Sequence, residues 1–247
     1  TMKLTILAFL ISIGGIALAQ NTSDSDTYFD KKSLPEFCDS FPTDKCPGKH
    51  GFIEIYEPLF APMRKDSIRF FEIGILNGLS HLMWRSYFKE AAIFGIDIRD
   101  YSEYSKGSGI MTFVADQSNR EDLSAFIDTS GGNFDVILDD GGHAMDQQQI
   151  SLGYLFPNIK PGGMYILEDV HTSLPVFYPD TSFIVDQNQT NTTLFMLEHF
   201  IRTGEILSDY LTREEEKYLQ ENIERIELHY IRNQRHSIVC VIHKKED

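Results

Sequence analysis

Two acidic motifs in the middle of this sequence each follow a short apolar segment. The first is Asp139-Asp140-Gly-Gly-His143 and the second is Glu168-Asp169-Val-His171. If the two segments are neighbouring parallel strands, both motifs lie at the carboxyl ends of the strands and therefore at the same edge of the sheet. Ligands bind at this edge in open α/β sheets. Carboxylates gathered there repel one another and raise their own pKa values unless a cation lies among them.

These side chains predict a divalent metal site. With few nitrogen or sulfur donors in the set, Mg²⁺ suits them better than Zn²⁺, and Mn²⁺ or Ca²⁺ would fit the same oxygens. We expect the ligands to be Asp140, Glu168 and Asp169. The competing interpretation is structural, since acids that follow strands often cap the next helix.

A histidine accompanies each acidic motif. His143 stands three residues beyond Asp140, and an imidazole near its ordinary pKa can accept the proton of a hydroxyl, so His143 is the candidate general base. His171 is a weaker candidate, which would line the substrate side of the pocket or support a carboxylate ligand. A purely structural role is the alternative for both.

A glycine-containing turn follows the apolar run that begins at Phe70. The turn holds Gly74 and Gly78, which allow close approach of a ligand and a tight entry into a helix. Asp97 stands 23 residues after Gly74, where a carboxylate can accept hydrogen bonds from both hydroxyls of a ribose. The third glycine of G-x-G-x-x-G is missing, which disfavours a dinucleotide, and glycines of this kind also occur for packing alone.

The elements that must position these residues alternate between strand and helix. Apolar runs predict strands over 68–73, 92–96, 111–115, 134–138 and 163–167, and helical spacing predicts helices over 50–63, 80–88, 120–127 and 146–156. Helices over 194–203 and 213–222 and strands over 223–230 and 237–243 follow. The predicted fold is α/β: a doubly wound, Rossmann-like, seven-stranded, mostly parallel sheet with a C-terminal antiparallel hairpin.

The N-terminal segment resembles a signal peptide. Lys3 precedes an apolar run that ends in Ala17-Leu-Ala19, a small-residue cleavage pattern, and the run is short for a membrane span. An uncleaved anchor or a buried helix is the alternative. We expect a signal peptide over 1–19, an extended arm over 20–48 and a catalytic domain over 49–247. The protein would then be secreted or lumenal, or periplasmic in a bacterium, without a stable membrane anchor.

Export changes how the cysteines and asparagines are interpreted. An oxidising compartment permits a disulfide between Cys38 and Cys46, whereas Cys240, in an apolar strand-like segment, is expected to be buried. Three sequons predict a glycoprotein where the machinery exists, the last two of them on a surface loop. They begin at Asn21, Asn188 and Asn191.

The charge of the chain limits its partners. The formal net charge is −15, and clustered Lys and Arg residues, which a nucleic acid or an anionic membrane surface requires, are absent from the sequence. We therefore expect a small-molecule or glycan acceptor rather than nucleic acid.

A series of motifs, in order along the chain, carries a family resemblance. The chain resembles the metal-dependent sugar O-methyltransferases of macrolide biosynthesis, of the mycinamicin and macrocin type, and the related family named for cephalosporin hydroxylase. The similarity runs from about Thr43 to His243. The matching segments are Thr43-Asp-Lys45 with His50, Tyr56 and Phe60; Glu72-Ile-Gly74 with Gly78; Met83-Trp84; Tyr87-Phe88; Gly95-Ile-Asp-Ile98; Asp116-Gln-Ser118; 134–143; and 155–172.

The resemblance implies a cofactor and roles for the motifs. It implies S-adenosylmethionine held by the acid and glycines of the first motif and by the acid of the next strand, with two further residues beside the adenine. In this sequence these are Glu72, Gly74, Gly78 and Asp97, and then Asp116 and Gln117. It also implies Mg²⁺ on Asp140, Glu168 and Asp169, His143 as the base, and a homo-oligomer through the N-terminal helix and arm.

The sequence departs from the family pattern at three places. Gly142 replaces a serine, Phe52 replaces a tyrosine, and Cys46-Pro47 interrupts a segment. Two rival functions remain open. One is an oxygenase-like reaction, for which the sequence shows no obvious set of two histidines and one carboxylate. The other is a secreted, catalytically idle nucleoside- or glycan-binding protein.

Overall fold

A computed structural model describes residues 32–177, 183–232 and 236–247 of the chain. The predicted signal peptide and the sequon at Asn21 lie outside these residues. Within them, no helix has the length and apolar character that a membrane span requires.

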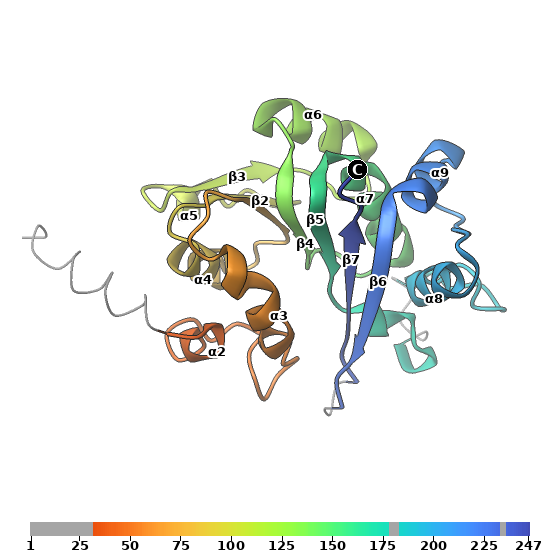
Figure 1. Ribbon diagram of the computed structural model, residues 1–247, viewed down its shortest axis with the longest axis horizontal. Helices are drawn as coiled ribbons and strands as arrows, with labels where there is room; N and C mark the ends of the chain where they lie inside the picture. The colour runs from red at the N-terminus through yellow and green to blue at the C-terminus, as the bar shows by residue number, and fades with distance from the viewer. Residues whose placement is uncertain (1–31, 178–182, 233–235) are drawn as a thin grey trace, which may run out of the picture.

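One seven-stranded sheet forms the centre of the molecule, with the strand order β3-β2-β1-β4-β5-β7-β6 (Figure 1). The strands are β1 Arg69–Ile73, β2 Ala92–Asp97, β3 Ile110–Val114, β4 Phe134–Asp139, β5 Ile159–Leu167, β6 Ile223–Tyr230 and β7 Ile238–Lys244. The first five pair in parallel, whereas β7 runs antiparallel to both β5 and β6. The predicted α/β fold with its C-terminal antiparallel hairpin is confirmed.

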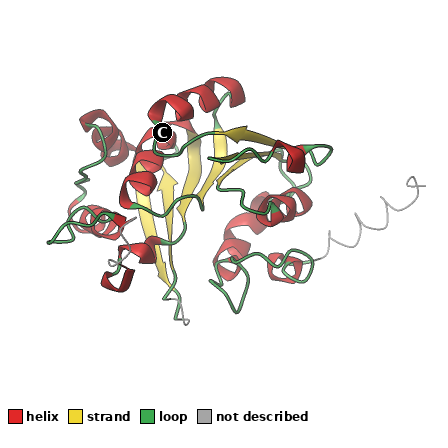
Figure 2. Cartoon of the chain, turned by 180° about the vertical axis from the view of Figure 1, so that it is seen from behind, coloured by secondary structure: helices red, strands yellow, loops and turns green. Residues whose placement is uncertain are grey.

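Helices cover both faces of this sheet (Figure 2). They are α2 Leu34–Phe37, α3 Ile53–Phe60, α4 Leu79–Tyr87, α5 Ser102–Ser105, α6 Arg120–Ser130, α7 Met145–Leu155, α8 Thr193–Thr203 and α9 Arg213–Asn222, with 3₁₀ turns at η1 Ala61–Met63, η2 Phe156–Asn158, η3 Val170–Ser173 and η4 Pro175–Phe177. On β1, Phe70 packs with α3 and α4, whereas Phe71 packs with α6. Because alternate residues face opposite layers, both need to be apolar, and this is why the strands read as continuous apolar runs.

Local signals set the helix ends. The side chain of Asn119 accepts hydrogen bonds from the backbone N–H groups of Glu121 and Asp122 at the start of α6, and α6 ends at Gly131, whose φ is 82°. Thr212 and Glu215 form a capping box at the start of α9. These caps satisfy backbone groups that have no partner inside the helix.

The segment expected to be an extended arm is folded onto the domain over its described part. Leu34 and Phe37 of α2 are fully buried in the core beneath α3, and the guanidinium of Arg64 lies 4.3 Å from the ring centroid of Tyr87 and 5.6 Å from that of Phe37. A helix of four residues is too short to produce a periodic pattern, so this packing could not be predicted from the sequence. The disulfide between Cys38 and Cys46 is formed, and Cys240 is buried as expected.

The expectation of a surface sequon at Asn191 is wrong. Its side chain is buried, and its amide nitrogen donates to the carbonyl of Ile184 and to the hydroxyl of Tyr210, each at 3.1 Å. Asn188 is exposed. A polar composition indicated a loop, but it could not show that one asparagine is turned inward to hold that loop together.

We predict that the disulfide stabilises the domain. It closes a loop with a sequence separation of 8, so the entropy it removes from the unfolded chain corresponds to about 2–3 kcal/mol. Denaturant unfolding of the wild type should lose this amount when a reductant is added, and the double variant Cys38→Ser, Cys46→Ser should not respond to the reductant. Equal responses of the two proteins would contradict the prediction.

Candidate active site

A cavity of about 590 Å³ opens beyond the carboxyl ends of β1, β2 and β4. The strand order reverses between β1 and β4, because β2 and β3 lie on one side of β1 whereas β4 and β5 lie on the other. Ligands of open α/β sheets bind at this switch point. Six of the predicted site residues line this cavity together. They are Gly74, Asp97, Asp116, Gln117, Asp140 and His143.

Gly74 lies where two strand ends meet. Its φ is 92°, and a Cβ placed on it would lie 2.1 Å from the carbonyl oxygen of Asp140. Only glycine therefore allows the turn after β1 to pack directly against the loop after β4. The backbone N–H of Asp140 donates to the carbonyl of Ile73 at 3.0 Å, which holds the two loops in this close contact.

Asp97 connects the second strand to the glycine turn. Its Oδ2 accepts a hydrogen bond from the N–H of Ile75 at 2.9 Å, and its Oδ1 accepts one from the N–H of Arg99 at 3.0 Å. The carboxylate thus fixes both loops that border this end of the cavity. Its predicted contact to a ribose stays a prediction.

Gln117 supports the acidic loop after β4. Its amide nitrogen donates to Oδ1 of Asp139 at 3.1 Å, and its amide oxygen accepts the N–H of Gly142. Asp139 is buried and also accepts the Tyr165 hydroxyl at 2.7 Å; burial raises its pKa to about 6. Asp139 thus faces the protein interior, and Asp140 is the acid of this motif that faces the cavity.

Glu72 and Gly78, both predicted to bind the cofactor, are not among the residues that line the cavity. Gly78 is the N-cap of α4, with a φ of 70°. Glu72 is fully buried, and it accepts hydrogen bonds from Ser80 Oγ and Trp84 Nε1, each at 2.9 Å. Burial raises the pKa of Glu72 to about 7, against the opposing effect of Lys45. Glu72 therefore faces the protein interior and not the cavity.

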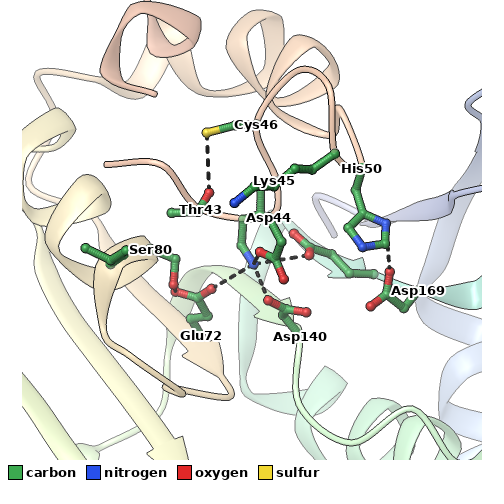
Figure 3. A network of polar contacts seen from close by, with 12 residues as sticks. Thr43, Asp44, Lys45, Cys46, His50, Glu72, Ser80, Asp140 and Asp169 are labelled. Atoms are coloured by element: carbon green, nitrogen blue, oxygen red, sulfur yellow. Dashed lines mark hydrogen bonds and ion pairs between the residues drawn. The ribbon is translucent and has the colours of Figure 1, made fainter. Parts of the chain in front are cut away.

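A buried lysine occupies the centre of the acidic cluster (Figure 3). The ammonium of Lys45 donates to Asp140 Oδ2, lies 3.1 Å from Glu168 Oε2 and lies 3.3 Å from Glu72 Oε1. Burial lowers the pKa of Lys45, but the surrounding carboxylates outweigh burial and hold it well above its ordinary value. Lys45 lies in one of the motifs that carry the family resemblance, but no role was predicted for it, since nothing in the local sequence shows that the 43–46 segment reaches this site.

Glu168, the predicted third metal ligand, contacts protein groups with both of its oxygens. Oε1 accepts the Tyr56 hydroxyl at 2.6 Å, and Oε2 accepts the Lys45 ammonium. Burial, followed by repulsion from Asp140, raises the pKa of Glu168 well above its usual range. Its role as a metal ligand stays a prediction.

Asp140, His143 and Asp169 form a group suited to a cation. One donor atom from each lies within 4.8 Å of the other two, and His143 Nε2 lies 3.2 Å from Asp169 Oδ2. Asp169 has a φ of 54°, a left-handed conformation that costs a non-glycine residue free energy and is common at functional sites. Burial raises the pKa of Asp169. A bound cation would offset that cost of burying a carboxylate.

Asp169 also belongs to a second group, with His50 and His171. No set of two histidines and one carboxylate is obvious in the sequence, but the fold brings these three side chains together. His50 comes from the loop before α3, far from Asp169 in the sequence, so only the fold brings the two together. The predicted role of His171 on the substrate side of the pocket finds no support here, since the cavity lining omits it.

Known proteins are similar to this chain in sequence and in fold. No family model matches the chain. Mycinamicin VI 2''-O-methyltransferase of Micromonospora griseorubida is 32% identical over 179 residues, which are 69% of this chain and 44% of that protein. Demethylmacrocin O-methyltransferase of Streptomyces fradiae is 33% identical over 150 residues, 58% of this chain and 38% of that protein. The chain thus spans less than half the length of these curated relatives.

A solved structure agrees with the sequence comparison. It is MycE methyltransferase from the mycinamycin biosynthetic pathway, in complex with Mg, S-adenosylhomocysteine (SAH) and mycinamycin VI. Its TM-score is 0.70 at 29% identity, over 87% of this chain and 55% of that one. This chain belongs to the macrolide-sugar O-methyltransferase family. The fold is accordingly that of the class I methyltransferases, and the predicted family resemblance is confirmed.

The close contact at Gly74 yields a prediction with a matched control. Gly74→Ala should destabilise the domain by more than the roughly 1–2 kcal/mol that a left-handed backbone alone costs an alanine, because the new methyl group meets the Asp140 carbonyl. Gly107 has a similar φ, 76°, and nothing within 4 Å of an added Cβ. Gly107→Ala should therefore lose only the backbone contribution in denaturant unfolding. Equal losses would show that the close packing of the two loops does not matter.

Proposed function

We propose that this chain is an S-adenosylmethionine-dependent, divalent-metal-dependent O-methyltransferase that acts on a hydroxyl of a sugar or a glycosylated small molecule. One observation carries the proposal: a single cavity is lined by Asp97, the proposed ribose contact, and by Asp140 and His143, the proposed metal ligand and general base. The solved relative that contains Mg, SAH and a macrolide supports it.

The donor set fits the divalent ion that this function requires. Asp140 and Asp169 provide carboxylate oxygens beside His143, and the Asp169 oxygen on that side is Oδ2. Four carboxyl groups surround the single positive charge of Lys45, so negative charge remains for a cation to neutralise. They belong to Glu72, Asp140, Glu168 and Asp169. Asp140 and Asp169 would hold Mg²⁺ or Mn²⁺, and Glu168 is the proposed third ligand.

The chain's own residues would prepare a hydroxyl for methyl transfer. When bound, the divalent ion lowers the pKa of an acceptor hydroxyl, and S-adenosylmethionine supplies the activated methyl group. Asp169 Oδ2, at 3.2 Å from His143 Nε2, orients the imidazole. His143 then takes the hydroxyl proton as the acceptor oxygen attacks the methyl carbon and the carbon–sulfur bond breaks. Alignment and this proton transfer are the main tasks of the protein, since the leaving group is already cationic.

We propose a secreted or lumenal location for this reaction. The Cys38–Cys46 disulfide supports it, because such bonds persist in oxidising compartments, and the signal-peptide character of residues 2–19 is the sequence evidence. Exposure of Asn188 is compatible with glycosylation there. The homo-oligomer also stays a proposal, which light scattering of the purified protein would test.

The cofactor site can be tested by calorimetry. S-adenosylmethionine should bind the purified protein, and Asp97→Ala should weaken binding by about 10- to 100-fold, because hydrogen bonds from two ribose hydroxyls to a carboxylate are lost. Asp100→Ala removes an equal charge from an exposed neighbour outside the cavity lining, and binding should not change. If the wild type fails to bind the methyl donor both with Mg²⁺ and with EDTA, the enzymatic proposal is wrong and the glycan-binding alternative gains.

The base can be tested by methyl transfer to a panel of glycosides and vicinal diols. His143→Ala should lower turnover by about 10²–10⁴-fold, the usual contribution of a general base, while calorimetric binding of the methyl donor stays within a few-fold of wild type. His199→Ala, on α8 and outside the cavity lining, is the matched control and should keep full turnover. Unchanged turnover in His143→Ala would exclude His143 as the base.

A further inference from the structure

We propose that His50, Asp169 and His171 form a second metal site, which binds one divalent transition-metal ion of the Zn²⁺ type. This site shares Asp169, and no other residue, with the oxygen-rich group of Asp140, His143 and Asp169. It is closed to the cavity and fixes the geometry of Asp169.

The distances among the three side chains suit such an ion. Asp169 Oδ1 lies 3.5 Å from His50 Nδ1 and 3.6 Å from His171 Nδ1, and one donor atom from each residue lies within 4.8 Å of the others. Zn²⁺ binds nitrogen and oxygen at about 2.0–2.2 Å in a tetrahedral arrangement, which separates neighbouring ligand atoms by roughly 3.4 Å. Small adjustments of the side chains would bring the three atoms onto one ion.

A buried oxygen without a donor is the second observation. Asp169 Oδ1 is buried and accepts no hydrogen bond from the residues that the structure describes. Leaving a carboxylate oxygen in this state is costly. An ion between Oδ1 and the two imidazoles would satisfy it, while Oδ2 stays directed at His143.

The surrounding residues hold both imidazoles in place. The ring of His50 stacks on Phe52 with centroids 5.1 Å apart, and its Nδ1 lies 2.8 Å from Ser237 Oγ. The ring of His171 packs edge-on against Phe177 at 5.2 Å. Figure 3 shows His50 directed at Asp169. Metal binding would replace the Ser237 contact of Nδ1 without moving the ring from its packed position.

The chemistry of the donors selects the ion, and their burial assigns it a structural role. Two imidazoles and one carboxylate favour Zn²⁺ and its neighbours over Mg²⁺, which prefers oxygen. An oxygenase iron would need open positions facing its substrate, but none of the three residues is among those that line the cavity. The ion would instead fix Asp169, whose two oxygens would then serve two neighbouring metal sites.

Zn²⁺ binding in the presence of millimolar Mg²⁺ tests the proposal. We expect the metal-free wild type to bind one Zn²⁺ per chain by calorimetry, and His50→Gln and His171→Gln to bind it at least ~100-fold more weakly, since even groups that only support a ligand contribute 10–100-fold. His199→Gln is the control for a histidine elsewhere. Asp140→Asn is the control for the oxygen-rich site, and both controls should bind Zn²⁺ as the wild type does. None of these measurements needs methyl transfer, so the result does not depend on the proposed function.

Three results would overturn the proposal. They are failure of the wild type to bind Zn²⁺ under these conditions, unchanged affinity in His171→Gln, or loss of Zn²⁺ binding in Asp140→Asn. Co²⁺ bound to the wild type gives a reading that requires no variant. We expect the intense visible absorption of a four-coordinate Co²⁺ ion, unchanged by excess Mg²⁺. The weak absorption of a six-coordinate ion would contradict the proposal.

Discussion

The burial of several carboxylates around one ammonium is the constraint on which the rest of this site depends. Lys45 lies within ion-pair distance of Glu72, near the end of β1, and of Asp140 and Glu168, which directly follow β4 and β5. Taking these charges out of water costs several kcal/mol for each ion, and the cost is recovered only if the charges face one another with good geometry. Burial, and after it repulsion from Asp140, raises the pKa values of Glu168 and Asp169. The negative charge that Lys45 leaves uncompensated makes the site receptive to further cations.

This constraint explains why the segment before the first strand is packed so firmly. The carbonyl of Lys45 accepts the N–H of Ile53 at the start of α3, and Cys46 is tied by the disulfide to the end of α2. The apolar residues of α2 and α3 are buried beneath α4. A mobile arm could not hold an ammonium among carboxylates in one position, so the disulfide, the short helix and the lysine act as one unit.

The sequence predicted the sheet well and the site only in part. Apolar runs marked the five parallel strands to within a residue or two, except that β5 begins at Ile159 rather than Gly163. Ile159 pairs with β4 ahead of an irregularity, and the regular pairing that the apolar run predicts resumes at Met164. Residues that follow strands, such as Asp97 and Asp140, were placed correctly in the cavity, since parallel topology fixes where strand ends lie. Lys45 and His50 had no assigned role, because they reach the site from a segment with no strand of its own. The burial of Glu72 also depends on packing against α4, which no pattern in β1 reveals.

The most direct test of this account is the stability of Lys45→Met, measured by denaturant unfolding at pH 8 and at pH 5. Removing one partner of a buried ionic cluster should cost about 3–5 kcal/mol, whereas Lys217→Met, on the exposed surface of α9, should cost little. The loss should be smaller at pH 5, because carboxylates with a raised pKa, such as Glu72 at about 7, then take up protons and no longer need the ammonium. Added Mg²⁺ should recover part of the loss at pH 8. A Lys45→Met protein as stable as the wild type at pH 8 would contradict the central role of this lysine.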